Sequence, residues 1–340
     1  MMKEILKRPL MTSLASSCLL VLCCCLPAGA WLLLPGTAGN SDPSHQPWVQ
    51  SLAWSPDSSQ LAVGSGNTSV TIWQIRPARL LITFTKHRYR VVSLAWSPRG
   101  TLLASADQEF VTYLWDPRTG QSIKQLESEY VAWSSDGARL AYTGAANINL
   151  WDAGSRQETI LVPATGGFEL VYPSNTHVAW SPDNTRLATS STDGTLTIWN
   201  VETGKPIRVI SAHKGFAEVV DWAPKGDLLA SGGDDRKLDV WDTATGRLLH
   251  QAEGPIRVLG VAWSPKVPGE LAWNSDSGQV TITDFGKLNM HLDAGNDGQI
   301  WVVAWSPDGK LLAAGTDENT VVVWDAASGR RVQLLTLPAP

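Results

Sequence analysis

The side chains best suited to catalysis or metal binding are few in this chain, and they form no recognised reactive group. No two of the six histidines stand at the spacing of a zinc-binding pair such as His-Glu-x-x-His. All four cysteines (Cys18, Cys23, Cys24 and Cys25) fall in the first 25 residues, which leaves no thiol in the rest of the chain. Neither the Gly-x-Ser-x-Gly of many hydrolases nor a Gly-Lys-Ser/Thr phosphate loop occurs. We therefore expect no enzyme activity, no metal site and no cofactor.

The composition indicates a folded, mildly acidic protein with an unusual choice of aromatic residues. Hydrophobic residues make up 43% of the chain and charged residues 17%, which excludes an intrinsically disordered protein. The 27 Lys and Arg against 32 Asp and Glu give a formal net charge of −5, which argues against nucleic-acid binding. The chain has 17 Trp beside only five Phe and five Tyr. The positions of these tryptophans explain the excess.

Residues 1–30 have the pattern of a secretory signal peptide. A basic start containing Lys3 precedes an apolar run from Leu10 to Leu26, and Ala28-Gly29-Ala30 offers a cleavage site. Alternatively, the apolar run extends to about residue 34, and its length of about 25 residues is then enough for an uncleaved signal anchor. In both cases we expect the rest of the chain to be exported: periplasmic, at the cell surface, secreted, or anchored on the non-cytoplasmic side. We assign residues 31–47 as a linker, mainly because residues 35–47 are rich in Gly, Ser, Asp, Asn and Pro.

An internal repeat determines the fold that we expect for residues 48–340. The phrase Ala-Trp-Ser-Pro-Asp recurs with variations at intervals of 37 to 47 residues, and a second aromatic residue follows 18 to 22 residues later. The repeated tryptophans are Trp54, Trp96, Trp133, Trp180, Trp222, Trp263 and Trp305, and the second aromatic residues are Trp73, Trp115, Trp151, Trp199, Trp241, Phe285 and Trp324. Each unit of about 40 residues has room for four short strands. The sequence therefore predicts an all-β, seven-bladed β-propeller of four-stranded antiparallel blades.

The fifth unit shows how the strands are delimited. We expect strand a at 218–222, strand b at 228–231, strand c at 237–241 and strand d at 247–251. Ala223-Pro224-Lys225-Gly226 has the Pro and Gly of a type I turn between a and b. The first expected strand of the ring is an a strand and the last is a d strand, so each blade is whole in sequence. We expect the ring to close by side-chain packing between blades one and seven, unless residues 37–46 add to an edge.

With these repeats the chain resembles the WD-repeat family. The Trp-Asp dipeptide that ends the family's unit stands at residues 115–116, 151–152, 241–242 and 324–325, and it is altered in the other three units. The resemblance covers Trp48 to about Leu337. It implies a β-propeller that serves as a scaffold for protein partners. It also implies a polar network within each blade, made of a His before strand a, a Ser or Thr in b, an Asp in the b–c turn and the Trp in c.

This implied network is complete in only one blade. Blade five would contain His213, Ser231, Asp235 and Trp241, and blade two would contain His87, Ser105, Glu109 and Trp115, with Glu in place of Asp. Blades three, six and seven lack most of the network. A further exception is Asp221, which replaces the alanine found before the other six repeated tryptophans. We expect its carboxylate either to have a partner or to serve a function, because an unpaired buried charge is costly.

One face of the expected propeller collects aromatic and basic residues. In this architecture the loops from strand d to the next strand a and the b–c turns share a face around the mouth of the channel. The residues expected there are Trp48, Arg88, Tyr89, Arg90, Tyr172, Lys214, Phe216, Arg257 and Trp301. Aromatic residues and Arg are enriched at the centres of protein interfaces. We expect these residues to bind protein partners.

The sequence thus favours a non-catalytic scaffold for protein–protein interaction, exported or membrane-tethered. We expect no nucleic-acid partner, and membrane contact only through an uncleaved first segment. One alternative is a sensor whose channel mouth binds a small ligand or a glycan, which a saturable thermal shift would reveal. Another is a propeller hydrolase whose acids and bases come from several blades and leave no linear motif. Turnover in a hydrolase screen would reveal the second.

Overall fold

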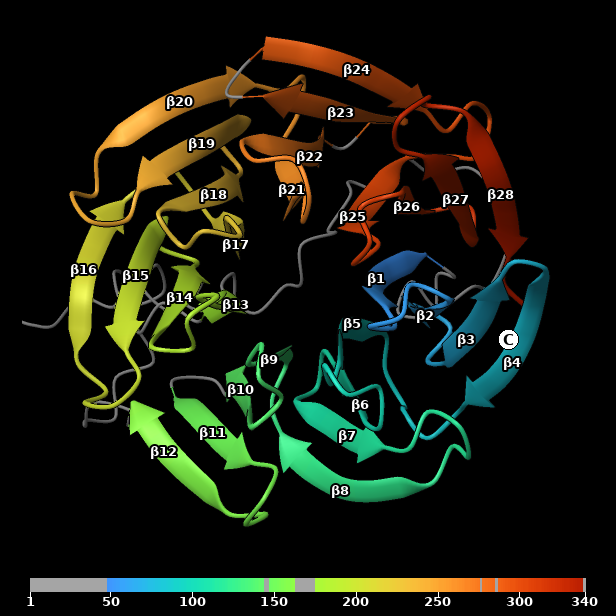
Figure 1. Cartoon of the computed structure of the whole chain (residues 1–340), viewed down its shortest axis with the longest axis horizontal. Coiled ribbons are helices and arrows are strands. Elements are labelled where there is room, and N and C mark those ends of the chain that lie inside the picture. The colour runs from blue at the N-terminus through green and yellow to red at the C-terminus, as the bar shows by residue number, and fades with distance from the viewer. Residues whose placement is uncertain (1–47, 144–146, 163–174, 276, 285–286, 339–340) are drawn as a thin grey trace, which may run out of the picture. The chain divides into compact units, whose positions relative to one another are not determined.

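The computed structural model describes residues 48–143, 147–162, 175–275, 277–284 and 287–338, all within the compact unit Ser41–Pro340. These residues form seven four-stranded antiparallel sheets arranged as blades around a ring (Figure 1). In every blade strand a lies nearest the centre of the ring and strand d lies at its perimeter. The predicted all-β, seven-bladed propeller is confirmed. The predicted signal peptide or anchor and the linker lie outside the described residues.

The first four blades follow one another along the chain. Blade one comprises β1 (Val49–Trp54), β2 (Gln60–Ser65), β3 (Val70–Ile75) and β4 (Ala78–Phe84). Blade two comprises β5 (Val91–Trp96), β6 (Leu103–Asp107), β7 (Val111–Trp115) and β8 (Ser122–Glu127). Blade three comprises β9 (Tyr130–Trp133), β10 (Arg139–Thr143), β11 (Ile148–Asp152) and β12 (Glu158–Val162). Blade four comprises β13 (Asn175–Trp180), β14 (Arg186–Ser191), β15 (Thr195–Asn200) and β16 (Pro206–Ser211).

The last three blades complete the ring. Blade five comprises β17 (Ala217–Trp222), β18 (Leu228–Gly233), β19 (Lys237–Asp242) and β20 (Leu248–Glu253). Blade six comprises β21 (Val258–Trp263), β22 (Glu270–Ser275), β23 (Gln279–Asp284) and β24 (Lys287–Asp293). Blade seven comprises β25 (Ile300–Trp305), β26 (Leu311–Thr316), β27 (Thr320–Asp325) and β28 (Arg331–Thr336).

The turns of blade five form where the sequence predicts them. The amide of Gly226 donates to the carbonyl oxygen of Ala223 (2.8 Å), and its φ of +75° is in the left-handed region that glycine adopts without strain. In the c–d turn, which is one residue longer, the amide of Gly246 donates to the carbonyl oxygen of Asp242 (2.8 Å). These two local turns bring the strands into antiparallel register, so the strands begin and end close to their predicted positions.

Hydrogen bonds between neighbouring blades explain the repeated Ala-Trp dipeptide. The indole Nε1–H of a strand-a tryptophan donates to the carbonyl oxygen of the residue just before the corresponding tryptophan of the preceding blade. Six such bonds of 2.9–3.3 Å are Trp54 to Ala304, Trp96 to Ala53, Trp180 to Ala132, Trp222 to Ala179, Trp263 to Asp221 and Trp305 to Ala262. The seventh indole, in Trp133 of blade three, is buried without a hydrogen-bond partner. The spacing of the tryptophans alone does not predict these bonds.

The ring closes between two complete blades. Strands β1–β4 and β25–β28 form separate sheets, and their apolar side chains join in one buried cluster that includes Val49, Leu61 and Val323. The bond from Trp54 to Ala304 crosses the same junction, as does one from the amide of Asp308 to the Ser58 hydroxyl (3.1 Å). Each blade is therefore whole in sequence among the described residues, as predicted. Residues 37–46 lie outside them.

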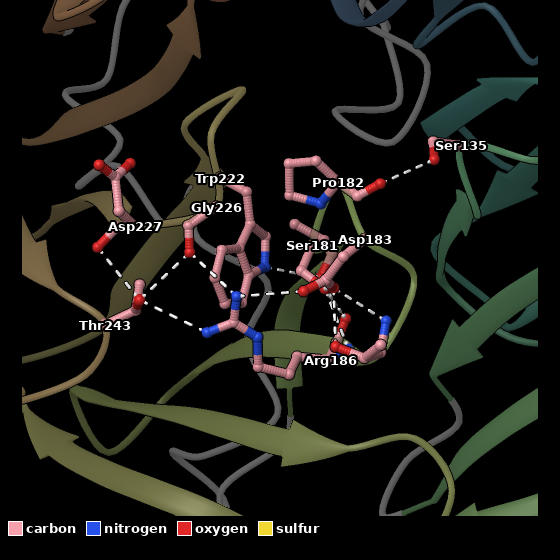
Figure 2. A network of polar contacts seen from close by, with 11 residues as sticks. Ser135, Ser181, Pro182, Asp183, Arg186, Trp222, Gly226, Asp227 and Thr243 are labelled. Carbon is pink, nitrogen blue, oxygen red and sulfur yellow. Dashed lines mark hydrogen bonds and ion pairs between the residues drawn. The ribbon is translucent and has the colours of Figure 1, made fainter.

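Arginine side chains connect blades three, four and five at their a–b turns. Figure 2 shows the contacts of one of them, Arg186, with Trp222 and Gly226. The guanidinium of Arg186 in blade four lies 4.7 Å from the ring centre of Trp222 in blade five, and it donates to the carbonyl oxygen of Gly226 (3.0 Å). Arg139 in blade three makes the same pair of contacts with blade four, to the Trp180 ring (5.1 Å) and to the carbonyl of Asn184 (3.2 Å). A guanidinium over an indole adds cation–π attraction to each hydrogen bond.

Candidate functional site

The loops from strand d to the next strand a lie beside the b–c turns, and backbone hydrogen bonds join them within a blade. Gly66 donates to Trp48 (2.8 Å), Gln108 to Arg90 (3.2 Å), Asp234 to Phe216 (3.0 Å) and Asp317 to Gln299 (3.1 Å). Both kinds of loop therefore share one face of the propeller, which we call the d–a face.

The predicted binding residues differ in how far they project from the d–a face. Arg88, Lys214, Tyr89 and Phe216 are exposed, the two aromatic side chains by 42% each. The half-buried members are Trp48, Arg90, Arg257 and Trp301. Tyr172 lies outside the described residues.

One group of these residues gathers where the ring closes. The rings of Trp48 and Trp301 stack with their centres 5.0 Å apart, and the guanidinium of Arg257 lies 5.6 Å from the centre of the Trp301 ring. Arg257 Nη1 also lies 3.9 Å from Glu218 Oε1. Phe216 is connected to this group, because its amide donates to the Asp234 carboxylate that neighbours Glu218. The structure thus combines stacked indoles, a guanidinium and carboxyl groups at one place.

Two acidic residues of this face were missed by the sequence analysis. Glu129 and Glu218 each stand four residues before a strand-a tryptophan, where blades one and two have Gln50 and Val92. Burial first, and then the neighbouring Asp234, raise the pKa of Glu218 to about 7 against the opposing charge of Arg257. Burial likewise raises the pKa of Glu129 to about 7 against the opposing charge of Arg90. A carboxylate four residues before a repeated tryptophan, a position that is uncharged in the other five blades, was the signal that could have identified them.

A second group surrounds Glu129. Arg90 Nε donates to the side-chain oxygen of Gln108, and burial lowers the pKa of Arg90. Burial raises the pKa of the neighbouring Tyr130 phenol, and the charges of Glu129 and Glu218 raise it further. The exposed Tyr89 precedes Arg90, so this group also has an exposed aromatic side chain at its edge.

The polar network expected in blade five is assembled in the structure. The Nδ1–H of His213 donates to Asp235 Oδ1 (2.9 Å), and Nε2 pairs with the Ser231 hydroxyl (2.8 Å). The indole of Trp241 donates to the same hydroxyl (2.9 Å). Burial tends to raise the pKa of Asp235, but the bonds from His213 and from the Lys214 amide outweigh it and hold this pKa below its usual value.

In blade two the acid of the network is Asp107, and the prediction of Glu109 is wrong. His87 pairs with Asp107 Oδ2 (3.0 Å) and with the Ser105 hydroxyl (2.7 Å), which also accepts the indole of Trp115 (3.1 Å). Asp107 stands at the end of β6, where blade five has Gly233, and its side chain is almost fully buried. Its other oxygen accepts the amide of Glu109 (3.1 Å), so Glu109 contributes backbone rather than its carboxylate.

Blade six lacks a tryptophan at the position of Trp241. Leu271 pairs with Thr283 in blade six as Leu229 pairs with Trp241 in blade five, so the residue in register is Thr283. The assignment of Phe285 to this position is wrong. The a–b turn of blade six is one residue longer than that of blade five, so the position in register lies 20 residues after the strand-a tryptophan instead of 19. Phe285 lies 22 residues after Trp263. Phe285 itself lies outside the described residues.

Asp221 has the partners that its position requires. One carboxylate oxygen accepts the amide of Trp222 and the other accepts the amide of Trp263 in blade six, both at 2.9 Å. Burial raises the pKa of Asp221 to about 7, although these two bonds oppose the rise. Its carboxyl therefore joins blades five and six.

Neither a metal site nor a membrane-spanning helix is found in the part of the chain that the structure describes. No three His, Cys, Asp or Glu side chains gather in a way that would hold a metal ion there. Within the same residues, no helix has the length and apolar character needed to cross a membrane.

Comparison with known families identifies the repeats. The model of the family described as "WD domain, G-beta repeat" matches residues 39–74, 78–116, 173–200, 204–242 and 286–325, which together exceed half of the chain. The unmatched stretches contain all of blade three and most of blade six. These are two of the three blades in which the sequence lacks most of the polar network.

Curated relatives resemble the chain along most of its length at low identity. It is 25% identical to "Protein tipD" of Dictyostelium discoideum over 319 residues, which are 89% of this chain and 44% of that protein. It is 23% identical to "THO complex subunit 3" of Arabidopsis thaliana over 283 residues, 83% of this chain and 64% of that protein. It is 22% identical to "Guanine nucleotide-binding protein subunit beta" of Zea mays over 324 residues, 88% and 75% of the two chains. The chain thus spans less than two thirds of the first two relatives.

Proposed function

The chain belongs to the WD domain, G-beta repeat family, and on that premise we propose that it is a non-catalytic scaffold whose d–a face binds protein partners. Two of its relatives are named as subunits, one of the THO complex and one of a guanine nucleotide-binding protein. Family membership supports a protein-interaction role in general. The choice of the d–a face rests on the side chains found there.

The observation that carries this choice is the combination of exposed aromatic rings with anchored guanidinium groups. Tyr89 and Phe216 project into solvent, whereas Arg90 and Arg257 are held by Gln108 and by the Trp301 ring. Arginines that are already ordered lose little side-chain entropy on binding, and aromatic residues with Arg dominate the energy of protein interfaces.

The charges of the face define the kind of partner that it suits. Glu129 and Glu218 are close to arginines and have pKa values raised to about 7, so they are partly protonated at neutral pH. Exposed Arg88 and Lys214 add positive charge at the edge of the same face. Exposed Asp193, Asp234 and Glu318 of the b–c turns add negative charge to it as well. We therefore propose a partner that presents apolar side chains with groups of both charges around them.

We also propose that the protein works outside the cytoplasm. This rests on the basic start, the apolar run and the small residues of positions 1–30. Sequencing the amino terminus of the product from its own host tests cleavage after Ala30. A mature protein that begins at Met1 and remains soluble in the cytoplasm would overturn this part of the proposal.

Capture of partners by the full chain from its own host, followed by mass spectrometry, tests the binding face. We expect the variants R88A/Y89A and K214A/F216A to capture about tenfold less of the proteins that the wild type binds. The matched control is I207A/V209A, which removes two exposed apolar side chains from β16 at the perimeter of blade four. Equal capture by the wild type and both d–a face variants would overturn the assignment of this face.

A further inference from the structure

Blade three is joined to blade two by the shortest of the connections between blades. The chain passes from β8 to β9 through Ser128 and Glu129 alone, and β9 has four residues where the innermost strands of the other six blades have six. Strand a of blade one begins with Val49, which is fully buried and packs closely on blade seven: a Cβ on Gly315 would lie 2.3 Å from its Cγ1 atom. The equivalent residue of blade three is Ser128, whose hydroxyl pairs with that of Thr112 (2.7 Å). A polar side chain thus stands where blade one has an apolar contact with its neighbour.

A hydrogen bond that joins the other blades is also missing at this junction. At six junctions the strand-a indole donates to a carbonyl oxygen of the preceding blade. Trp133 is only 9% exposed, yet its indole Nε1 has no partner among the residues that the structure describes. Within the same residues, the buried hydroxyl of Thr143 and the buried indole nitrogen of Trp151 also have none. Unpaired polar groups of this kind cost free energy in a closed blade, and water pairs them when the blade opens.

Mainly apolar contact holds blades two and three together. One buried cluster joins Ala104 of blade two to apolar side chains of blade three. The amide of Val131 donates across the junction to the Ser93 hydroxyl (3.2 Å). The ion pair between Lys124 and Glu158 (2.6 Å) lies at the solvent-exposed perimeter, where such a pair adds little stability.

The junction that closes the ring has more bonds, although blades one and seven are not consecutive in the chain. The Trp54 indole donates to the carbonyl oxygen of Ala304 (3.1 Å). The Asn67 side-chain amide donates to the carbonyl oxygen of Pro338 (3.3 Å), which follows the last strand of blade seven. These bonds add to the buried contact of Val49 and to the bond between the blades' a–b turns. We therefore expect the closure to be stronger than the junction between blades two and three.

Glu129 places a charge at the weaker junction. Its half-buried carboxyl interacts with the charges of Arg90, Glu109 and Asp107 in blade two and forms a hydrogen bond with the Tyr130 phenol. Burial is the largest cause that raises its pKa from 4.5 to about 7; Arg90 opposes the rise, and the two acids of blade two add to it. The closed junction thus holds this proton more tightly than an open one, and it loses stability as the pH rises towards 7.

From these observations we propose that the ring opens reversibly between blades two and three, and that the charge of Glu129 controls the opening. The blades turn about the two-residue connection of Ser128 and Glu129, while the closure between blades one and seven stays intact. Ionised Glu129 favours the open form, in which water hydrates its carboxylate. The proposal does not depend on partner binding at the d–a face.

Thiol labelling of the full chain with iodoacetamide, measured at each site by mass spectrometry, tests the proposal. The variant A104C places a thiol in the cluster between blades two and three, and A313C is its match in the cluster between blades seven and one. Both alanines are 0% exposed and stand eight residues after a repeated tryptophan, so each thiol reacts only when its junction opens. We expect A104C to react at least about tenfold faster than A313C at pH 7. Peptide mapping separates both sites from the natural cysteines at positions 18–25.

A charge variant tests the role of Glu129. Glu129→Gln keeps the size of the side chain and removes its charge, so at pH 8 it should slow the labelling of A104C by about tenfold. The matched control is Glu218→Gln, at the same position of strand a in blade five, which should leave this rate unchanged.

Two ring variants test the missing hydrogen bond. Trp54→Phe and Trp133→Phe remove the same volume from similarly buried side chains, but only the first removes a bond between blades. Trp54→Phe should therefore speed the labelling of A313C by about fivefold more than Trp133→Phe speeds that of A104C.

Several results would overturn the proposal. Labelling of A313C as fast as that of A104C refutes opening between blades two and three, and equal effects of the two ring variants refute the missing bond as its cause. An unchanged rate in Glu129→Gln refutes control by this charge. If A104C does not fold, hydrogen exchange of the unsubstituted chain decides: amides of β9 must exchange faster than those of β1.

Discussion

Blades five and six are neighbours with the same strand order, yet their interiors differ completely. Blade five contains a connected chain of His213, Ser231, Asp235 and Trp241, whereas blade six has a tryptophan on strand b and a hollow beside strand c. Both form four strands with the same pairing. The comparison teaches that the polar network is not needed to form a blade, because turns and alternating apolar side chains suffice.

The two blades also differ in how they are attached to their surroundings. Blade six compensates for its missing network with bonds to both neighbours: its Trp263 amide donates to Asp221, and its Asn274 side chain donates to the carbonyl of Ile300 (2.7 Å) in blade seven. Blade five also has bonds to its neighbours, such as those from Arg186 to Gly226 and from Trp222 to Ala179, but it has an internal network in addition. The following predictions separate these two modes of stabilisation, beginning with the largest expected effect.

Replacing Trp241 by threonine should convert blade five towards blade six. The indole is 6% exposed and donates to Ser231, so its loss leaves both a cavity and a weakened network. We expect the free energy of unfolding to fall by about 3–5 kcal/mol. Urea denaturation of the full chain measures it.

The control for this substitution is Trp73→Thr in blade one. Trp73 is only partly buried and donates to Thr71 on its own strand, so its loss should cost clearly less. An equal loss of unfolding free energy in both variants would show that the network of blade five adds no stability beyond that gained by burying an indole ring.

Replacing His213 by alanine tests the network without removing a large ring. It leaves the Ser231 hydroxyl and the Asp235 carboxylate without the bonds that join them, which should cost about 1–3 kcal/mol. The exposed imidazole of His291 in blade six gives a comparison, and His291→Ala should change stability by less than about 0.5 kcal/mol. A similar small change in both would mean that the bonds of His213 do not stabilise blade five.

The carboxyl that joins the two blades should give a pH dependence. The pKa of Asp221 is raised from 3.8 to about 7, so the folded protein holds its proton more tightly than the unfolded chain does. Protonated Asp221 therefore adds to the free energy of unfolding at low pH, and this contribution is lost as the pH rises towards 7. Because the side chain is only partly buried, we expect a loss of about 1–2 kcal/mol.

The variant Asp221→Asn removes this titration. Urea denaturation at several pH values measures the unfolding free energy of both proteins. As the pH rises to 7, we expect the variant to become more stable relative to the wild type. Since Glu129 and Glu218 titrate in the same range in both proteins, only the difference reports on Asp221. Parallel pH profiles would contradict the raised pKa.

The sequence predicted most of the fold but only part of the candidate site. Repeated tryptophans and Pro/Gly turns located the seven blades, and the exposed residues Tyr89 and Phe216 were expected on the face where they lie. The acids Glu129 and Glu218 were missed, although each stands four residues before a repeated tryptophan, because their burial beside arginines depends on how the blades pack. The hollow was missed because the spacing of Phe285 suggested that an aromatic ring filled it.

What the sequence alone determined is everything that depends on neighbours along the chain. A turn such as Ala223–Gly226 closes within four residues, and a repeat of about 40 residues is visible without any structure. What the tertiary structure decided is which groups meet across blades. Asp107 rather than Glu109 reaches His87, the Trp54 indole meets a carbonyl 250 residues away, and an indole absent from position 283 leaves a hollow. These contacts depend on the angle and distance between packed sheets, which no spacing in a sequence specifies.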